Sequence, residues 1–356
     1  MGGRVHKARL RRLFRRLDGV ADAVLPQGDA VLLQGDAQLL RWLTGTAEGM
    51  AVATRRGVMM VAHPMFAEAC SETPWPVTVL SGKTAGPKAV REALGKARRV
   101  GVRFQTLSHG LFLQLRKQLR GRKLVDITEV VAAVTRKRDE ATIADQRRAC
   151  RIAARAARAV PSMCQEGMTE IDLMAEISFH MAGDAGGGGI GGGMTAFGAR
   201  TSHPHVVTGR RRLRKGDLVM VDFGARVNGV GSDITRTFVF GKASAEQRAL
   251  YAEVYKALQL SFELIRKRRD VRAINAAVSA LFKKDDYGPF IHSVGHGLGG
   301  FGGAFHTCVG AINTVEPGLY VPGFGGVRIE DDILITAPGE FELLTGASPR
   351  SKLIEI

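Results

Sequence analysis

Short apolar runs alternate with segments of helical periodicity over the first third of the chain. The apolar runs predict strands at residues 30–33, 58–62, 99–102 and 124–127. Apolar residues spaced three and four apart predict helices at residues 9–17, 88–97 and 107–119. Short strands and helices in alternation are typical of a small α/β domain.

A longer helical pattern follows the charged segment 135–140. Apolar positions between Ile143 and Val160 fall on one face and predict a helix over residues 141–160. A second helix is expected over residues 170–181, with Thr169 as its N-cap. A chain of 356 residues exceeds the size at which one core keeps growing. The pattern therefore predicts two domains, 1–134 and 139–356.

A hairpin is predicted in the second domain. Two apolar stretches, 218–226 and 231–240, flank Asn228-Gly229, which is the strongest short signal for a two-residue β-turn. Such a turn places Val227 opposite Val230, and the register of every later pair follows from that one.

Two aspartates fall on the same face of this hairpin. Counting from the turn, Gly224 lies opposite Asp233 and Asp222 lies opposite Thr235, so the two carboxylates are diagonal neighbours. Asp222 also follows the apolar run 218–221, where an ionised carboxylate is costly unless it is paired or bound to metal. An ion pair with an arginine explains one such aspartate equally well, whereas two on one face favour a cation.

Further candidate ligands follow in later segments. His292 and His296 stand four residues apart, Glu316 ends a strand-like run, and Glu330 alternates with Arg328 in another. A lone histidine is more often a satisfied core residue than a ligand, but here two acids accompany it. An oxygen-rich site with one imidazole suits manganese, cobalt or zinc.

Charge and cysteine content narrow the classes of protein. The net charge is +17, from 51 Lys and Arg against 34 Asp and Glu, and the basic runs 9–16, 151–158 and 210–215 are interpreted as solvated helix faces and loops. Aromatic residues make up only 6% and do not accompany these runs, so no nucleic-acid-binding module is indicated. The four cysteines form no CxxC pair, and no apolar stretch reaches membrane-spanning length. We expect a cytoplasmic protein without a membrane segment.

The near-continuous glycines at residues 186–193 are interpreted as a flexible loop beside a cleft. A phosphate-binding loop requires a helix directly behind it, and residues 194–199 predict none.

Five motifs together resemble the pita-bread metallopeptidases, which include prolidase, aminopeptidase P, methionine aminopeptidase and creatinase. The motifs are Gly216-Asp217-Leu218 with Val221-Asp222-Phe223-Gly224-Ala225, Ser232-Asp233-Ile234-Thr235-Arg236-Thr237-Phe238, Gly295-His296-Gly297-Leu298-Gly299, Thr314-Val315-Glu316-Pro317-Gly318-Leu319-Tyr320, and Gly326-Val327-Arg328-Ile329-Glu330-Asp331-Asp332. The resemblance is strong over 139–356 and weaker over the first domain, around residues 40–45. It implies an α+β fold in which a creatinase-like α/β domain, 1–134, precedes a pita-bread catalytic domain, 139–356.

The resemblance also implies an activity. Methionine aminopeptidases lack the first domain and creatinase does not keep the metal ligands, so the match points to hydrolysis of the bond before proline. The implied enzyme is an Xaa-Pro dipeptidase or aminopeptidase whose substrate is a peptide with proline at the second position. It would be a homodimer with two divalent ions per subunit, and a metal-bridging hydroxide would attack the scissile carbonyl. The implied metal ligands are Asp222, Asp233, His296, Glu316 and Glu330.

Individual roles follow from the same resemblance. Asp222 would bind one ion, His296 with Glu316 the other, and Asp233 with Glu330 would bridge them. Glu316 would also carry the proton to the leaving nitrogen. The other implied catalytic residues are His205 and His292, which would hold the substrate or its oxyanion, and Arg328, which would support a ligand or bind a carboxylate.

The chain departs from the family pattern at Gly303, where prolidase-like enzymes have a second histidine. His306 is a candidate replacement. Two alternatives therefore stay open: a weakened pseudo-peptidase that acts as a basic module for RNA, the ribosome or a protein, and hydrolysis of a non-peptide amide.

Overall fold

The computed structural model describes residues 2–18, 30–81, 85–185, 190–284, 289–298 and 303–356. The chain divides into two compact units, Met1–Arg136 and Lys137–Ile356. No helix among the described residues combines the length and the apolar character that crossing a bilayer requires.

The N-terminal unit is built on one mixed sheet. Its described strands lie in the order β4-β3-β2-β1-β5-β6, with β1 antiparallel to β2 and parallel to β5. The strands are β1 (Ala30–Leu33), β2 (Met50–Thr54), β3 (Gly57–Ala62), β4 (Val77–Val79), β5 (Arg99–Val102) and β6 (Lys123–Asp126). The helices are α1 (Gly2–Asp18), α2 (Ala37–Thr44), α3 (Ala67–Ser71), α4 (Ala85–Leu94), α5 (His109–Gln118) and α6 (Thr128–Arg136).

The predicted strands of this unit are all present, but several elements have no counterpart in the sequence analysis. Strand β2 contains two alanines, and β4 is only three residues long with little burial, so neither gives a strong β signal. Helix α2 is eight residues long and depends on tertiary contacts. Its N-cap Asp36 accepts a hydrogen bond from the Leu39 N–H and pairs with Arg103 at 2.9 Å.

The C-terminal unit contains four long helices and three sheets among its described residues. The helices are α7 (Glu140–Met163), α8 (Glu170–Ala185), α9 (Ala245–Arg266) and α10 (Val271–Lys284). One sheet has the order β16-β10-β8-β7 with β9 beside β8, the second β11-β14-β15, and the third β12-β13. The strands are β7 (Ile190–Phe197), β8 (Leu218–Val227), β9 (Val230–Gly231), β10 (Ile234–Val239), β11 (Ile312–Val315), β12 (Gly318–Val321), β13 (Gly325–Arg328), β14 (Asp331–Ala337), β15 (Glu340–Leu343) and β16 (Ile354–Glu355).

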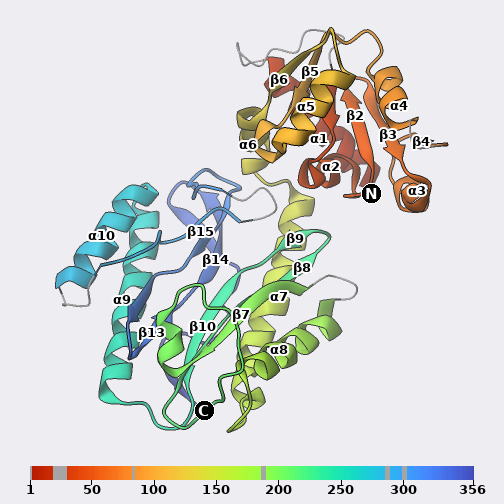
Figure 1. Cartoon of the computed structure of the whole chain (residues 1–356). Coiled ribbons are helices and arrows are strands. Elements are labelled where there is room, and N and C mark those ends of the chain that lie inside the picture. Colours follow the sequence, from red (N-terminus) through yellow and green to blue (C-terminus); the bar gives the residue numbers. More distant parts are fainter. Residues whose placement is uncertain (1, 19–29, 82–84, 186–189, 285–288, 299–302) are drawn as a thin grey trace. The chain divides into compact units, whose positions relative to one another are not determined.

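The two largest apolar cores among the described residues of this unit each join a helix pair to strands. In one, α7 and α8 pack on strands β7, β8 and β10, and in the other α9 and α10 pack on strands β11 to β14. Figure 1 shows the two helix pairs on opposite sides of the strands of this unit. Helix α7 has the predicted apolar face, because the residues from Ala149 to Val160 that were expected to be buried are buried.

The predicted register of the hairpin is confirmed. Val227 pairs with Val230, and Asp222 pairs with Thr235. The turn residues Asn228 and Gly229 both have positive φ, 48° and 82°, as a type I′ turn requires.

The interpretation of residues 186–193 as a loop is wrong for residues 190–193, while residues 186–189 lie outside the described part of the chain. Residues 190–193 begin strand β7, which pairs with β8 and places Met194 opposite Asp222. A Cβ on Gly193 would lie 2.6 Å from the Asp222 carbonyl oxygen, so this strand approaches β8 too closely for a side chain there. Close backbone packing explains the glycine at this position.

Candidate metal centre

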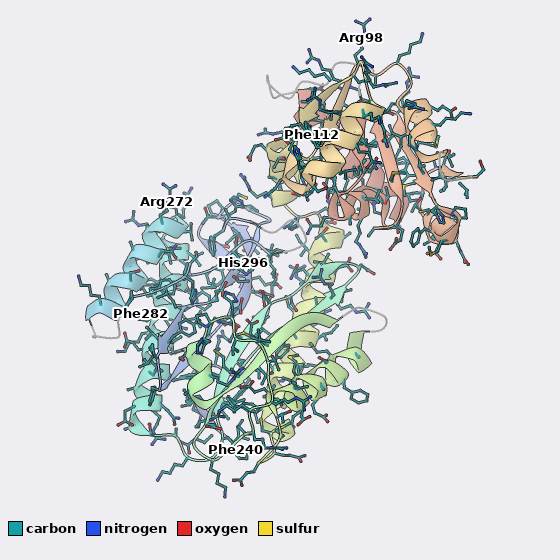
Figure 2. All side chains as sticks on the ribbon, viewed as in Figure 1. Arg98, Phe112, Phe240, Arg272, Phe282 and His296 are labelled. Atoms are coloured by element: carbon teal, nitrogen blue, oxygen red, sulfur yellow. The ribbon has the colours of Figure 1, made fainter. Side chains whose placement is uncertain are left out.

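The five implied metal ligands and the three other implied catalytic residues, His205, His292 and Arg328, line one cavity of the C-terminal unit. The cavity has a volume of about 240 Å³. His296 lies between the α9–α10 and the α7–α8 helix pairs in Figure 2. The described residues that line the cavity are Pro204, His205, Asp222, Asp233, His292, Ser293, Gly295, His296, Glu316, Arg328 and Glu330.

The hairpin contributes Asp222 and Asp233. Asp222 lies within β8, and Asp233 precedes β10 on the opposing strand. A Cβ on Gly224 would lie 1.9 Å from the Ser232 carbonyl oxygen, so glycine is required where the two strands cross most closely. The hairpin register thus brings both carboxylates to the cavity.

His296 and Glu316 meet because their segments run antiparallel. Thr314 donates its N–H to the His296 carbonyl at 2.9 Å, and Glu316 donates to the Val294 carbonyl at 2.7 Å. A Cβ on Gly295 would lie 2.1 Å from the Thr314 carbonyl oxygen, so this pairing excludes any larger residue before the histidine. The Thr314 hydroxyl accepts from the His296 N–H and donates to a Glu316 carboxylate oxygen, both at 3.0 Å.

The His296 ring is oriented with one nitrogen toward carboxylates. Nδ1 lies 3.1 Å from the Gly297 carbonyl, which can only accept, so in the neutral ring the proton is on Nδ1. Nε2 then presents its lone pair toward Glu316 at 3.5 Å and Asp233 at 3.8 Å. A backbone carbonyl on one nitrogen and anionic oxygens near the other is the arrangement of a metal-binding histidine.

Glu330 occupies the short gap between β13 and β14. Its N–H donates to the Thr235 carbonyl at 3.1 Å, and one carboxylate oxygen accepts from the Thr235 hydroxyl at 2.6 Å. That hydroxyl in turn accepts from Arg328 Nε at 3.0 Å. Arg328 also donates to an Asp222 oxygen at 2.5 Å. The ion pair weighed for Asp222 is therefore present, but it is one contact within a larger acidic cluster.

Burial and mutual repulsion raise the pKa values of three acids in this cluster, Asp233, Glu316 and Glu330. Burial raises the pKa of Glu330 well above its usual range, and the charges of Asp233 and Glu316 raise it further. Burial also raises the pKa of Asp233 well above its usual range, and the charge of Asp222 adds to the effect. Burial raises the pKa of Glu316 as well. Mutual repulsion of this kind is relieved by a bound cation.

The donor atoms are also close enough to share an ion. One ligand atom from each of Asp233, His296 and Glu330 lies within 4.8 Å of the other two. Three donors around one ion at bonds of about 2.0–2.2 Å lie about 3.4–3.8 Å apart, so inward movement of these side chains would bring all three onto one ion. Asp222 and Glu316 line the same cavity outside this close group of three.

A hydrogen-bonded chain lies beside the acidic cluster. Arg328 donates to the Tyr320 oxygen at 3.0 Å, and that oxygen lies 3.0 Å from His292 Nε2. His292 Nδ1 lies 2.8 Å from the Ser293 carbonyl, so the ring proton is on Nδ1 and the Tyr320 hydroxyl donates to Nε2. Burial lowers the pKa of His292, which keeps the ring neutral near pH 7.

His205 reaches the cavity from a separate segment, after the short helix η4 (Gly198–Ser202). Its neighbour Pro204 accepts a hydrogen bond from Arg328 at 3.0 Å. His306 is not among the described residues that line the cavity. Its backbone N–H and carbonyl are bound by the Asn313 side chain. A Cβ on Gly303 meets no described atom within 4 Å.

Three supporting residues were missed by the sequence analysis as site residues. They are Tyr320, which joins Arg328 to His292, and Asp332 and Arg236, which lie behind the metal candidates. Asp332 accepts the Asp233 N–H at 3.0 Å and the Cys150 thiol at 3.2 Å. Arg236 donates to the Glu330 carbonyl at 2.6 Å and pairs with Asp331 at 2.8 Å. All three lie within the family motifs, and that position was the available signal.

Comparison with known proteins places this geometry in a family. Residues 144–337 match metallopeptidase family M24, and residues 16–136 match the creatinase/prolidase N-terminal domain. An Xaa-Pro dipeptidase of Pyrococcus furiosus is 31% identical over 246 residues, which cover 66% of this chain and 70% of that protein.

Solved structures agree over nearly the whole chain. The Xaa-Pro dipeptidase from Bacillus anthracis superimposes with a TM-score of 0.84 at 26% identity, covering 99% of this chain and 100% of that one. The prolidase from Pyrococcus horikoshii gives a TM-score of 0.83 at 25% identity, with coverage of 97% and 100%. These matches confirm the fold and the family that the five motifs predict. The chain belongs to metallopeptidase family M24 and carries a creatinase/prolidase N-terminal domain ahead of its peptidase domain.

Proposed function

We propose that this peptidase hydrolyses the peptide bond that precedes proline and that it does so with two divalent ions. The observation that carries the proposal is the His296 ring, whose Nδ1 is bound to a backbone carbonyl while Nε2 faces Glu316 and Asp233. That orientation is suited to a cation between the three groups. The names of the relatives support the choice of an Xaa-Pro peptide as substrate.

The acidic cluster would hold the ions. Asp222 would bind one, His296 with Glu316 the other, and Asp233 and Glu330 both. When bound, a pair of such ions lowers the pKa of water enough to supply a nucleophile near neutral pH and polarises the scissile carbonyl. Manganese, cobalt and zinc all suit one imidazole among carboxylates.

The remaining residues would handle the substrate. His205 and His292 line the cavity from two different segments and would hold the substrate. The one ring proton of neutral His292 is bound to the Ser293 carbonyl, so His205 would donate to the substrate carbonyl or its oxyanion. Glu316 would move a proton to the leaving nitrogen. Arg328 would orient Asp222 and, through Tyr320, the His292 ring.

The size of the cavity favours a small substrate. Its volume of about 240 Å³ is below the range of about 300–1,000 Å³ that is usual for sites of drug-sized ligands. We therefore propose a dipeptide in preference to a longer peptide. A homodimer stays a prediction from the resemblance, and a cytoplasmic location stays a prediction from the cysteine and hydropathy pattern of the sequence.

The decisive experiment measures metal and turnover on the same samples. We expect protein prepared with Mn²⁺ or Co²⁺ to hold two ions per chain by elemental analysis and to release proline from Xaa-Pro dipeptides faster than it cleaves Xaa-Pro-Xaa tripeptides. Asp222→Asn should lose an ion and most of the activity. Asp270→Asn is the matched control, because that residue is exposed and asparagine preserves its N-cap bond to Ala273.

Stoichiometric metal without turnover of either peptide would overturn the proposal. In that case, salt-sensitive retention of RNA would support the basic binding module as the alternative. Turnover of a non-peptide amide alone would support the third possibility.

A further inference from the structure

A buried carboxylate outside the cavity holds both ends of the segment that carries His205. Glu170 is the first residue of α8 and has no exposed surface. One of its oxygens accepts the Phe197 N–H at 3.0 Å, and the other accepts the Gly209 N–H at 2.8 Å. The Thr195 N–H also donates to the Thr208 hydroxyl at 2.8 Å, and the Ile171 N–H to the Gly209 carbonyl at 3.2 Å. With these bonds, the Glu170 side chain holds together the two ends of residues 198–208, which we call the His205 loop.

A third bond ties the interior of the loop to the same carboxylate. Arg200 donates from Nε to Glu170 at 3.0 Å and from a terminal nitrogen to the Val207 carbonyl at 2.6 Å. The Arg200 side chain is 39% exposed, so it reaches Glu170 from the surface side. A Cβ on Gly209 would lie 3.3 Å from both the Glu170 oxygen and the Arg200 side chain. The base of the loop is thus closely packed around one acid.

The tip of the loop is joined to the candidate site. Arg328 donates to the Pro204 carbonyl at 3.0 Å, and the Thr201 hydroxyl accepts the Gly326 N–H at 2.7 Å. Pro204 and His205 both line the cavity. The loop is therefore held at its base by Glu170 and at its tip by strand β13.

We propose that Glu170 is a positioning residue that acts on the substrate through His205. This rests on the proposed function, because it assumes that His205 binds the substrate. None of the hydrogen bonds described for Glu170 involves a candidate metal ligand, so its loss should leave the ions bound and displace only the loop. A buried acid that satisfies two backbone donors and a guanidinium leaves those donors unpaired when it is removed.

The first test is a double-mutant cycle. Glu170→Gln keeps the shape of the side chain but turns an amide N–H toward one of the backbone N–H donors. We expect kcat/KM on an Xaa-Pro dipeptide to fall about tenfold, as loss of a hydrogen bond to a charged group predicts. Glu170→Gln should have little further effect in a His205→Ala background, because both changes remove the same contribution. Metal content should match that of the unchanged chain.

The second test follows the loop without any substrate. Hydrogen exchange at residues 198–208 should accelerate in Glu170→Gln. The matched control is Glu176→Gln, which makes the same change at an exposed position of the same helix and should leave exchange and kcat/KM unchanged.

We expect Arg200→Ala to fold, because the Arg200 side chain is partly exposed and its removal leaves no buried group unpaired on Arg200 itself. It should accelerate exchange in the loop and lower kcat/KM by about threefold, and it enters the same cycle with His205→Ala if Glu170→Gln does not fold.

The proposal is overturned if the kcat/KM loss of the double variant equals the product of the losses of Glu170→Gln and His205→Ala. It is also overturned if Glu170→Gln leaves hydrogen exchange in the loop unchanged. If the unchanged chain cleaves neither class of peptide, it is the proposed function that fails. The exchange comparison would then still decide whether Glu170 holds the loop.

Discussion

The Tyr320 hydroxyl oxygen lies 3.0 Å from both Arg328 and His292, and the hydrogen bonds on either side of it run in one direction. Arg328 donates to the phenol, the phenol donates to Nε2, and Nδ1 donates to the Ser293 carbonyl. The tyrosine thus connects the guanidinium that contacts Asp222 to an imidazole at the cavity wall. The Ser293 carbonyl fixes the tautomer of His292, and the Tyr320 hydroxyl donates to the ring nitrogen that this tautomer leaves as an acceptor.

Replacing Tyr320 with Phe should therefore separate substrate handling from metal binding. We expect kcat/KM on an Xaa-Pro dipeptide to fall by about 10- to 100-fold, the range for hydrogen bonds to charged groups. The metal content should stay the same, because Tyr320 is not among the candidate ligands. Tyr255→Phe, in helix α9 and outside the cavity lining, is the control. Loss of metal in Tyr320→Phe would contradict this division of roles.

Removal of metal should lower the stability of the C-terminal unit. The carboxylates of Asp233, Glu316 and Glu330 repel one another in the ion-free protein, and binding of an ion to the folded state alone stabilises it by mass action. At a free ion concentration one hundred times the Kd, the free energy of unfolding rises by about 2.7 kcal/mol. We expect Mn²⁺ to raise Tm and a chelator to reverse the rise, measured by far-ultraviolet circular dichroism. Asp233→Asn should greatly reduce the shift, and an equal shift in both proteins would count against the site.

The buried pair of Asp36 and Arg103 should dominate the stability of the N-terminal unit. Both side chains are less than 10% exposed, and Arg103 Nε lies 2.9 Å from the Asp36 oxygen. Asp36→Asn keeps a cap for the Leu39 N–H but leaves a buried guanidinium without its counter-charge, which should cost about 3 kcal/mol or more. Adding Arg103→Leu should recover much of that loss.

Urea unfolding followed by tryptophan fluorescence measures this cost directly. Both tryptophans of the chain, Trp42 and Trp75, belong to the N-terminal unit. The signal therefore reports that unit even where the two units unfold separately. A double variant no more stable than Asp36→Asn would show that the pair is not the source of the loss.

The four thiols should react at very different rates. Cys308 is exposed, whereas burial raises the pKa of the Cys164 thiol to about 12. Because the thiolate is the reactive form, only about one Cys164 side chain in 10⁴ is reactive at pH 8, and its labelling should rise tenfold per pH unit up to about pH 12. Burial raises the pKa of Cys150 well above its usual range as well.

Reaction with a disulfide reagent at pH 8 should therefore show a fast phase that corresponds to one thiol per chain, Cys308. Cys308→Ser should abolish it. Two fast phases, or a fast phase that survives the substitution, would contradict the burial of the other thiols.

The hairpin part of the site was predictable because a two-residue turn fixes every later pair on its strands. Asp222 and Asp233 could be placed on one face from the position of Asn228-Gly229 alone. The family motifs supplied His296, Glu316 and Glu330, but nothing local predicts that residues 294–298 run beside β11. That pairing depends on glycines that allow close backbone contact, such as Gly295.

Other features lay beyond local patterns for the same reason. Glu170 looked like an ordinary acid in the first turn of a helix, and its three partners are 27 to 39 residues away. The glycines that begin β7 looked like a loop, because glycine in a strand signals close approach only when the neighbouring strand is known. The Gly303 carbonyl accepts the Gly297 N–H at 2.8 Å, and the Asn313 side chain binds the backbone of His306, so these two positions also depend on contacts with distant residues.

The bond between Thr235 and Glu330 also has a consequence for the order in which the site is assembled. It joins residues 95 positions apart, so the hairpin carboxylates are synthesised long before Glu330 arrives. At about 5–20 residues per second, the ribosome needs roughly 5–20 seconds to cover that interval. During that time the nascent hairpin presents two acids without their remaining partners. Ion loading should therefore follow, and not accompany, synthesis of the first half of this domain.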